Sequence, residues 1–210
     1  MKSIILGGLA LVFSCAAAAA GALHLNPDQP GTASNMETFG QTSMPIGYFR
    51  YCQRYAELCQ RPAEAESIEL TRERWRQMVE INNYANTSIL PLTDQEIFGV
   101  EEKWEYPETV GDCEDYALLK RKLLNEKGFP LGSLLLTVGR DAKGGGHAVL
   151  TVVTDLGDFV LDNVEPKILL WRDAEIYFLK RQSGEDPNSW VSLLQSSDPF
   201  QQYSVAAGRE

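Results

Sequence analysis

A single cysteine at the start of an expected helix constrains this chain more than any other feature. Residues 111–116 read GDCEDY, so that Asp112 can cap the helix and two further acids follow in its first turn. Apolar residues then recur at helical spacing, and Gly128 predicts the helix end. Unpaired N–H groups at a helix start lower the pKa of a cysteine. Cys113 is therefore either a reactive thiol or a small buried hydrophobe beside a helix cap.

A basic run, residues 120–122, lies on the same expected helix. We expect it to form the solvated, C-terminal side of that helix rather than a site for polyanions. The whole chain has a formal net charge of −10 and a pI of about 4.8. This acidity argues against nucleic acid or an anionic membrane surface as a partner, because both require clustered Lys and Arg.

Three strands are predicted after the helix, because short β-branched and apolar runs alternate with polar or glycine-rich turns: 134–138, 147–153 and 158–161. The last two form a hairpin if a four-residue turn pairs Val153 with Asp158. In that register Asp162 lies opposite Val149, and His147 becomes a diagonal neighbour of Asp162 on the same face. A slip of one residue would send the two side chains to opposite faces.

Cys113, His147 and Asp162 together suit nucleophilic attack on an acyl carbon. The thiolate attacks, the imidazole transfers the proton, and the carboxylate fixes the imidazole tautomer. His147 follows three glycines, which leave room for a substrate backbone. The backbone N–H of Cys113 is the expected oxyanion donor. A structural role for His147 is the alternative.

Two segments of the chain, GDCEDYALLKRKLL and GHAVLTVVTDLGDFVLDN, resemble the bacterial transglutaminase-like cysteine peptidases, a family that includes the LapG-type periplasmic proteases. The similarity extends over residues 41–192. The resemblance implies an α+β fold with a papain-like, transglutaminase-like core, in which the nucleophile helix packs on an antiparallel sheet. It places the family triad on Cys113, His147 and Asp162, and it implies a cysteine endopeptidase that acts through a thioester.

The resemblance also implies a calcium site built from the acids around the cysteine: Asp112, Glu114 and Asp115. Carboxylate oxygens are hard ligands that suit Ca²⁺, which takes about six to eight oxygens. Helix capping alone is the alternative explanation for these acids.

The LapG-type branch processes a surface adhesin under the control of an inner-membrane regulator. The resemblance therefore implies a protein or peptide substrate in the cell envelope, such as an adhesin, and a regulator of that kind. Two other functions stay open. One is an acyl-transfer enzyme, of transglutaminase or amidase type, that uses the same triad. The other is a non-catalytic, calcium-responsive binding module.

The N-terminus predicts export, because a short basic start precedes an apolar run and a small-residue cleavage region. We expect residues 1–22 to be a signal peptide that is removed, which leaves a periplasmic protein without a membrane span. A loose leader over 23–44, one peptidase domain over 45–194 and a poorly ordered tail over 195–210 are expected to follow.

Cys52 and Cys59 are close in sequence and could form a disulfide in an oxidising periplasm, which would leave Cys113 as the free thiol. Two cysteines seven residues apart on one straight helix are too distant for this bond. The segment must therefore bend if the disulfide forms.

Upstream of the cysteine, Trp75, Met78 and Ala85 predict an amphipathic helix whose apolar face enters the core. Thr93 and Glu96 have the spacing of a capping box, which predicts a short turn of helix.

Overall fold

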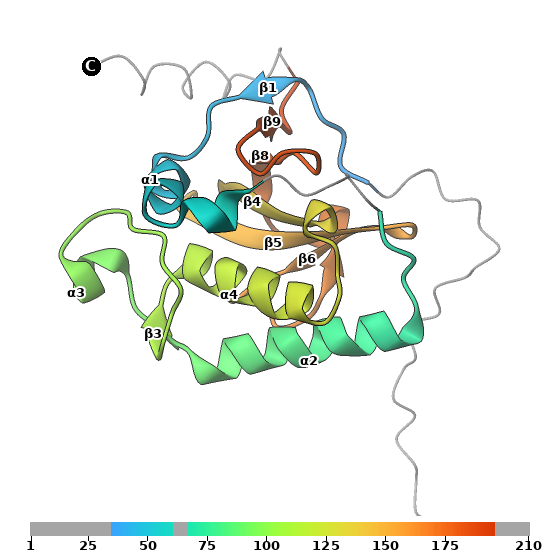
Figure 1. Ribbon diagram of the computed structural model, residues 1–210, viewed down its shortest axis with the longest axis horizontal. Coiled ribbons are helices and arrows are strands. Elements are labelled where there is room, and N and C mark those ends of the chain that lie inside the picture. Colours follow the sequence, from blue (N-terminus) through green and yellow to red (C-terminus); the bar gives the residue numbers. More distant parts are fainter. Residues whose placement is uncertain (1–34, 61–66, 196–210) are drawn as a thin grey trace, which may run out of the picture. The chain divides into compact units, whose positions relative to one another are not determined.

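The computed structural model describes residues 35–60 and 67–195, and its main element is a seven-stranded antiparallel sheet in the order β1-β9-β8-β4-β5-β6-β7 (Figure 1). The strands are β1 Gln41–Thr42, β4 Leu134–Arg140, β5 Gly146–Thr154, β6 Gly157–Leu161, β7 Leu169–Leu170, β8 Tyr177–Gln182 and β9 Trp190–Ser192. A separate parallel pair consists of β2 Leu90–Pro91 and β3 Val110–Gly111. This mixture of helices and antiparallel sheet confirms the predicted α+β class.

Helix α4, Cys113–Glu126, packs across β4 and β5, and α2, Arg72–Ser88, packs alongside α4 (Figure 1). Trp75 of α2 also makes an edge contact with Phe159 of β6, with 5.3 Å between the ring centroids. Two shorter helices, α1 Ile46–Arg54 and α3 Asp94–Phe98, complete the helical layer. The predicted amphipathic helix is thus confirmed as α2, with Met78 and Ala85 fully buried. No helix among the described residues is long and apolar enough to span a membrane.

Apolar side chains bury both faces of the sheet. On the α4 side, alternate residues of the central strands, such as Leu150 and Leu161, enter the main core. On the opposite side, Val149 and Val160 pack with Met36 from the N-terminal segment. Central strands covered on both faces are expected to be buried at nearly every position, as β6 is.

The predicted hairpin register is confirmed. Val153 pairs with Asp158 and Leu150 with Leu161, and one further pair brings Thr154 opposite Gly157. Gly157 has a φ of 126°, a conformation that residues with a side chain rarely adopt, so it suits the end of this tight turn. The register that predicts Asp162 beside His147 is therefore the observed one.

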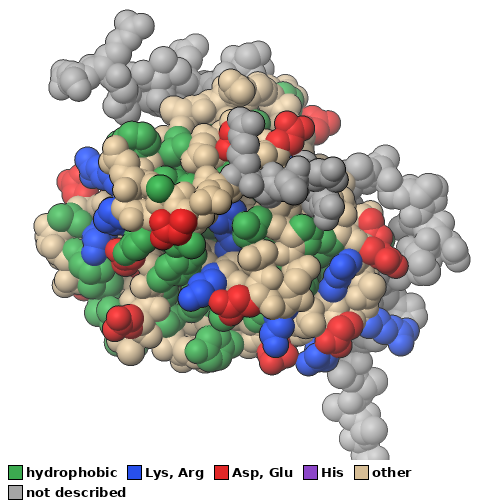
Figure 2. Space-filling view, viewed as in Figure 1, with side chains coloured by type: hydrophobic (Ala, Val, Ile, Leu, Met, Phe, Trp, Pro, Cys, Tyr) green, Lys and Arg blue, Asp and Glu red, His purple; other side chains and the backbone are tan. Residues whose placement is uncertain are grey.

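The expectation for the basic run is wrong at its first two residues. Lys120 is fully buried and Arg121 is 7% exposed, so neither side chain faces solvent. The Arg121 side chain donates to the Leu134 carbonyl at 3.0 Å. On the face shown in Figure 2, Lys and Arg side chains lie interspersed with Asp and Glu side chains.

The predicted disulfide between Cys52 and Cys59 is present, with 5.7 Å between the two Cα atoms. The required bend is also observed. Helix α1 ends at Arg54, and after Tyr55 the chain continues as a separate 3₁₀ turn, η1 Ala56–Cys59. Among the described residues, Cys113 is the free cysteine.

The predicted signal peptide, residues 1–22, lies outside the described residues, as do 23–34 of the predicted leader and 196–210 of the predicted tail. Residues 35–44 of the leader contribute β1. Within them, the Asn35 side chain and the Met36 backbone N–H donate to the Asp158 carboxylate at 2.7 and 2.9 Å.

Candidate active site

Helix α4 begins at Cys113, as the sequence predicts. Asp112 occupies the cap position with an extended backbone, but its side chain makes no capping hydrogen bond. Asp115, at the third helical position, accepts a hydrogen bond from the Asp112 backbone N–H, which is the reciprocal half of a capping box. A Cβ on Gly111 would lie 2.9 Å from the Asp115 carboxylate, so a larger residue there would displace this acid. These local contacts give a structural reason for Gly111 before the cysteine and for Asp115 after it.

His147 and Asp162 form the contact that the hairpin register predicts. The His147 Nε2 atom lies 2.8 Å from Asp162 Oδ1. Two further hydrogen bonds hold Asp162: the Val164 backbone N–H donates to Oδ1 at 3.0 Å, and Asn86 of α2 donates to its backbone carbonyl at 2.8 Å. Burial opposes ionisation of Asp162, but the hydrogen bond and charge of His147 outweigh it and leave the pKa of Asp162 lowered. The carboxylate can therefore orient the imidazole.

Cys113 lies beside the strand that carries the histidine. Strand β6 ends at Leu161, opposite Leu150, and its ladder with β5 does not extend to Ala148. The Ala148 backbone N–H instead interacts with the Cys113 sulfur and acts to lower its pKa, against the larger effect of burial. Cys113 is thus adjacent to the residue that follows His147, at the point where β6 stops.

The pKa of Cys113 changes in the direction opposite to the expected one, and the neighbouring acids contribute to this change. Burial is the main cause that raises the pKa of Cys113 well above its usual value, and the charge of Glu114 is the second. The thiol donates to Glu114 Oε2 at 3.2 Å, an interaction that favours the protonated sulfur. The predicted lowering of this pKa is wrong for the arrangement in the structure, because the acids and burial outweigh the helix start.

Three carboxylates gather beside the thiol, and one of them was not expected. Asp94, Asp112 and Glu114 each offer an oxygen within 4.8 Å of the others. Burial raises the pKa of all three groups, that of Glu114 to about 9. The Oδ1 atoms of Asp94 and Asp112 are buried without a hydrogen-bond partner among the described residues. Buried carboxylate oxygens that lie close together are the kind of ligand that a hard cation requires.

The parallel pairing of β2 with β3 explains why Asp94 joins the cluster. It aligns Leu90 with Val110 and Pro91 with Gly111, so the residues that follow each strand lie side by side. The confirmed capping box of Thr93 and Glu96 then starts α3 at Asp94. The sequence predicts that capping box, but no local pattern in the sequence marks the parallel pair.

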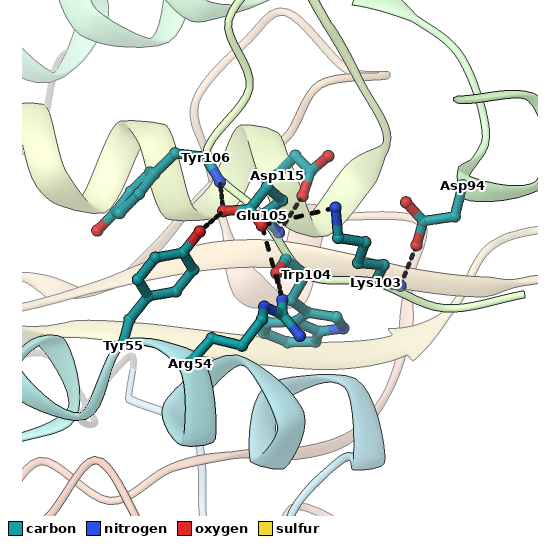
Figure 3. A network of polar contacts seen from close by, with 8 residues as sticks. All are labelled: Arg54, Tyr55, Asp94, Lys103, Trp104, Glu105, Tyr106 and Asp115. Atoms are coloured by element: carbon teal, nitrogen blue, oxygen red, sulfur yellow. Dashed lines mark hydrogen bonds and ion pairs between the residues drawn. The ribbon is translucent and has the colours of Figure 1, made fainter. Parts of the chain in front are cut away.

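Asp115 is not a member of the acid cluster. Its Oδ1 accepts the Glu105 backbone N–H at 2.8 Å, whereas Asp94 accepts the backbone N–H of Lys103 (Figure 3). Burial raises the pKa of Asp115 to about 8. Asp115 and Asp94 together hold the segment of residues 103–105, which precedes β3 and Cys113 in the chain.

Trp104, in that segment, packs in the core and does not face the thiol. It is 1% exposed and makes edge contacts with Tyr48 and Trp190, with ring centroids 5.5 and 6.5 Å away. Its indole N–H donates to Glu102 at 2.5 Å.

Comparison with known proteins identifies one matching family model, described as bacterial transglutaminase-like cysteine proteinase, over residues 38–198. Among solved structures, LapG from Legionella pneumophila is similar at 23% identity and a TM-score of 0.48, over 64% of this chain and 76% of that chain. Its EGTA-treated form gives 24% identity and 0.49 over the same shares. Its calcium-bound form gives 20% and 0.49, over 76% of this chain and 98% of that chain. None of the curated proteins compared with the chain matches it.

Proposed function

This chain belongs to the bacterial transglutaminase-like cysteine proteinases, and we propose that it is an exported endopeptidase whose catalytic residues are Cys113, His147 and Asp162. The observation that carries the proposal is the 2.8 Å contact between His147 Nε2 and Asp162 Oδ1. His147 lies on β5, and the backbone N–H of the next residue, Ala148, interacts with the Cys113 sulfur. Nucleophile, base and orienting acid then occur in the order that this chemistry needs.

The chemistry follows from these three side chains. His147 accepts the Cys113 proton, and the sulfur attacks the peptide carbonyl carbon while the Cys113 backbone N–H supports the oxyanion. The carbon–nitrogen bond breaks as His147 returns the proton to the leaving amine, which leaves a thioester on Cys113. Water then attacks the thioester and gives a proton to His147. The carbon–sulfur bond breaks as His147 passes this proton to the sulfur, which releases the acid and restores the thiol, and Asp162 holds the imidazole throughout.

Calcium is the ion that we propose for the acid cluster, and Asp94, Asp112 and Glu114 are the residues that would hold it. The two buried oxygens without partners on Asp94 and Asp112 fit such an ion. When bound, the cation supplies positive charge next to the thiol, which favours the thiolate. The chain's own acids raise the pKa of Cys113, so their neutralisation would remove one cause of that rise.

Export to the periplasm and a substrate in the cell envelope form the last part of the proposal. The N-terminal sequence supports export. The Cys52–Cys59 disulfide is consistent with an oxidising compartment, where such bonds persist. A surface adhesin as substrate and an inner-membrane regulator remain proposals that the family resemblance suggests.

The test compares envelope fractions from cells that produce the wild-type protein or the Cys113→Ala variant, with mass spectrometry of newly formed protein N-termini. We expect cleavage products that occur with the wild-type protein and are lost with Cys113→Ala. Glu126→Gln, on the exposed end of α4, is the matched control and should retain them. Circular dichroism should show that Cys113→Ala folds. A folded Cys113→Ala variant that still generates the products would refute the proposed nucleophile.

A further inference from the structure

A cavity of about 440 Å³ opens directly beside the catalytic histidine and aspartate. Both His147 and Asp162 line it, whereas Cys113 does not. Its other walls come from the loop before β5, from β6 and β7, and from the segment before β8. This volume is large enough to hold several atoms of a substrate side chain.

The position of the cavity relative to the triad decides which part of a substrate it can hold. The acyl half of a substrate becomes attached to the Cys113 sulfur. The amine half receives its proton from His147, so the chain that begins at this amine must pass the imidazole. A cavity lined by His147 and not by Cys113 therefore lies on the side of the leaving segment.

We infer that this cavity is the subsite for the substrate residues C-terminal to the scissile bond, and that it selects an apolar side chain accompanied by a basic one. The inference rests on the proposed function, because it needs His147 to protonate a leaving amine. It assigns a binding role to residues that have no part in the bond chemistry.

The apolar preference follows from one wall of the cavity. Val160 of β6, Leu169 of β7 and Ile176 line this wall. Val160 is 2% exposed and belongs to the core cluster on the face away from α4, and Ile176 packs against the same cluster. The wall is therefore supported from behind, and an apolar side chain placed against it would bury additional apolar surface.

The basic preference follows from the charge of the remaining lining residues. Apart from Asp162, four acids and two lysines line the cavity: Asp141, Glu165, Asp173, Glu175, Lys143 and Lys167. Asp141 and Glu165 accept backbone N–H groups of their own loops, so they are held in place. Asp173 and Glu175 are exposed and available to a ligand. This excess of carboxylates favours a Lys or Arg side chain over an acidic one.

The experiment is cleavage of a peptide library derived from a proteome digest, with sequencing of the products on both sides of each cleaved bond. The wild-type enzyme should prefer an apolar residue and a Lys or Arg within the first positions after the bond. In the variant Asp173→Asn/Glu175→Gln, the preference for Lys and Arg over Glu at those positions should fall about threefold to fivefold. Preferences before the bond should not change.

Glu108→Gln/Glu126→Gln is the matched control, because it removes the same charge from exposed positions outside the cavity. It should keep the wild-type profile. Ile176→Ala provides a second test and should broaden the apolar preference toward larger side chains after the bond. An unchanged profile in both cavity variants, or a change confined to positions before the bond, would overturn the inference while cleavage dependent on Cys113 still supported the proposed function. A wild-type enzyme that cleaves no peptide would overturn both.

Discussion

Replacement of Lys120 by methionine is expected to stabilise the protein, most strongly in acid. Lys120 lies in the middle of α4 and is fully buried. Its Nζ atom has no hydrogen-bond partner among the described residues, and it lies 5.9 Å from the centroid of the Tyr116 ring. A buried ammonium group without partners costs free energy, whereas methionine fills a similar volume without a charge.

The magnitude follows from the shift in the Lys120 pKa. Burial lowers this pKa from 10.5 to about 7, although the charge of Asp162 opposes the change. At about 1.36 kcal/mol per pH unit, the folded state loses about 5 kcal/mol when Lys120 is fully protonated. Because the folded pKa is the lower one, the unfolded chain binds more protons between about pH 7 and pH 10.5. The penalty is complete below pH 7 and disappears as the pH rises through this window.

Urea unfolding of the wild-type protein and Lys120→Met at pH 6, 8 and 9.5 measures this effect. At pH 6 the variant should gain about 2 to 5 kcal/mol in unfolding free energy, since replacement of buried ions by apolar groups often gives 1 to 4 kcal/mol. The gain should shrink as the pH rises. Lys122→Met, at an exposed position of the same helix, is the matched control and should change stability little. A loss of stability at pH 6, or a gain independent of pH, would refute the reasoning.

Three further outcomes are expected. Cys52→Ala/Cys59→Ala should lower the unfolding free energy by about 2.5 kcal/mol, as the entropy of the closed loop implies; equal stability of this variant and the oxidised wild type in urea would contradict this. Calcium at a hundred times its Kd should stabilise the wild-type protein by about 2.7 kcal/mol in thermal unfolding. Asp94→Asn should lose this response and Glu126→Gln should keep it, and an identical response in both would remove Asp94 from the site. Asp162→Asn should reduce kcat about 10²- to 10⁴-fold, because His147 loses its orienting acid; near-normal turnover of the same substrate would exclude that role.

Local rules determined much of the fold around the cysteine. Helix signals predicted the start of α4 at Cys113, and they hold because capping and first-turn charges depend on neighbours a few residues away. The hairpin register was also predictable, since side chains alternate along a strand and a short turn leaves few alternatives. That register alone predicted the contact between His147 and Asp162.

Contacts between distant segments determined the remainder. The parallel pairing of β2 with β3 brings Asp94 to the acids around Cys113, and no local pattern marks that pairing. The packing of α4 against both α2 and the sheet buries Lys120, which a helical pattern alone assigns to solvent. Burial also reverses the expected pKa change of Cys113. The sequence by itself determined which groups are candidates for the chemistry and how they follow one another along the chain. Only the tertiary structure decided the direction of the pKa changes of Cys113 and Asp162 and brought a third acid beside the cysteine, because desolvation and electrostatic interactions depend on everything that packs around a group.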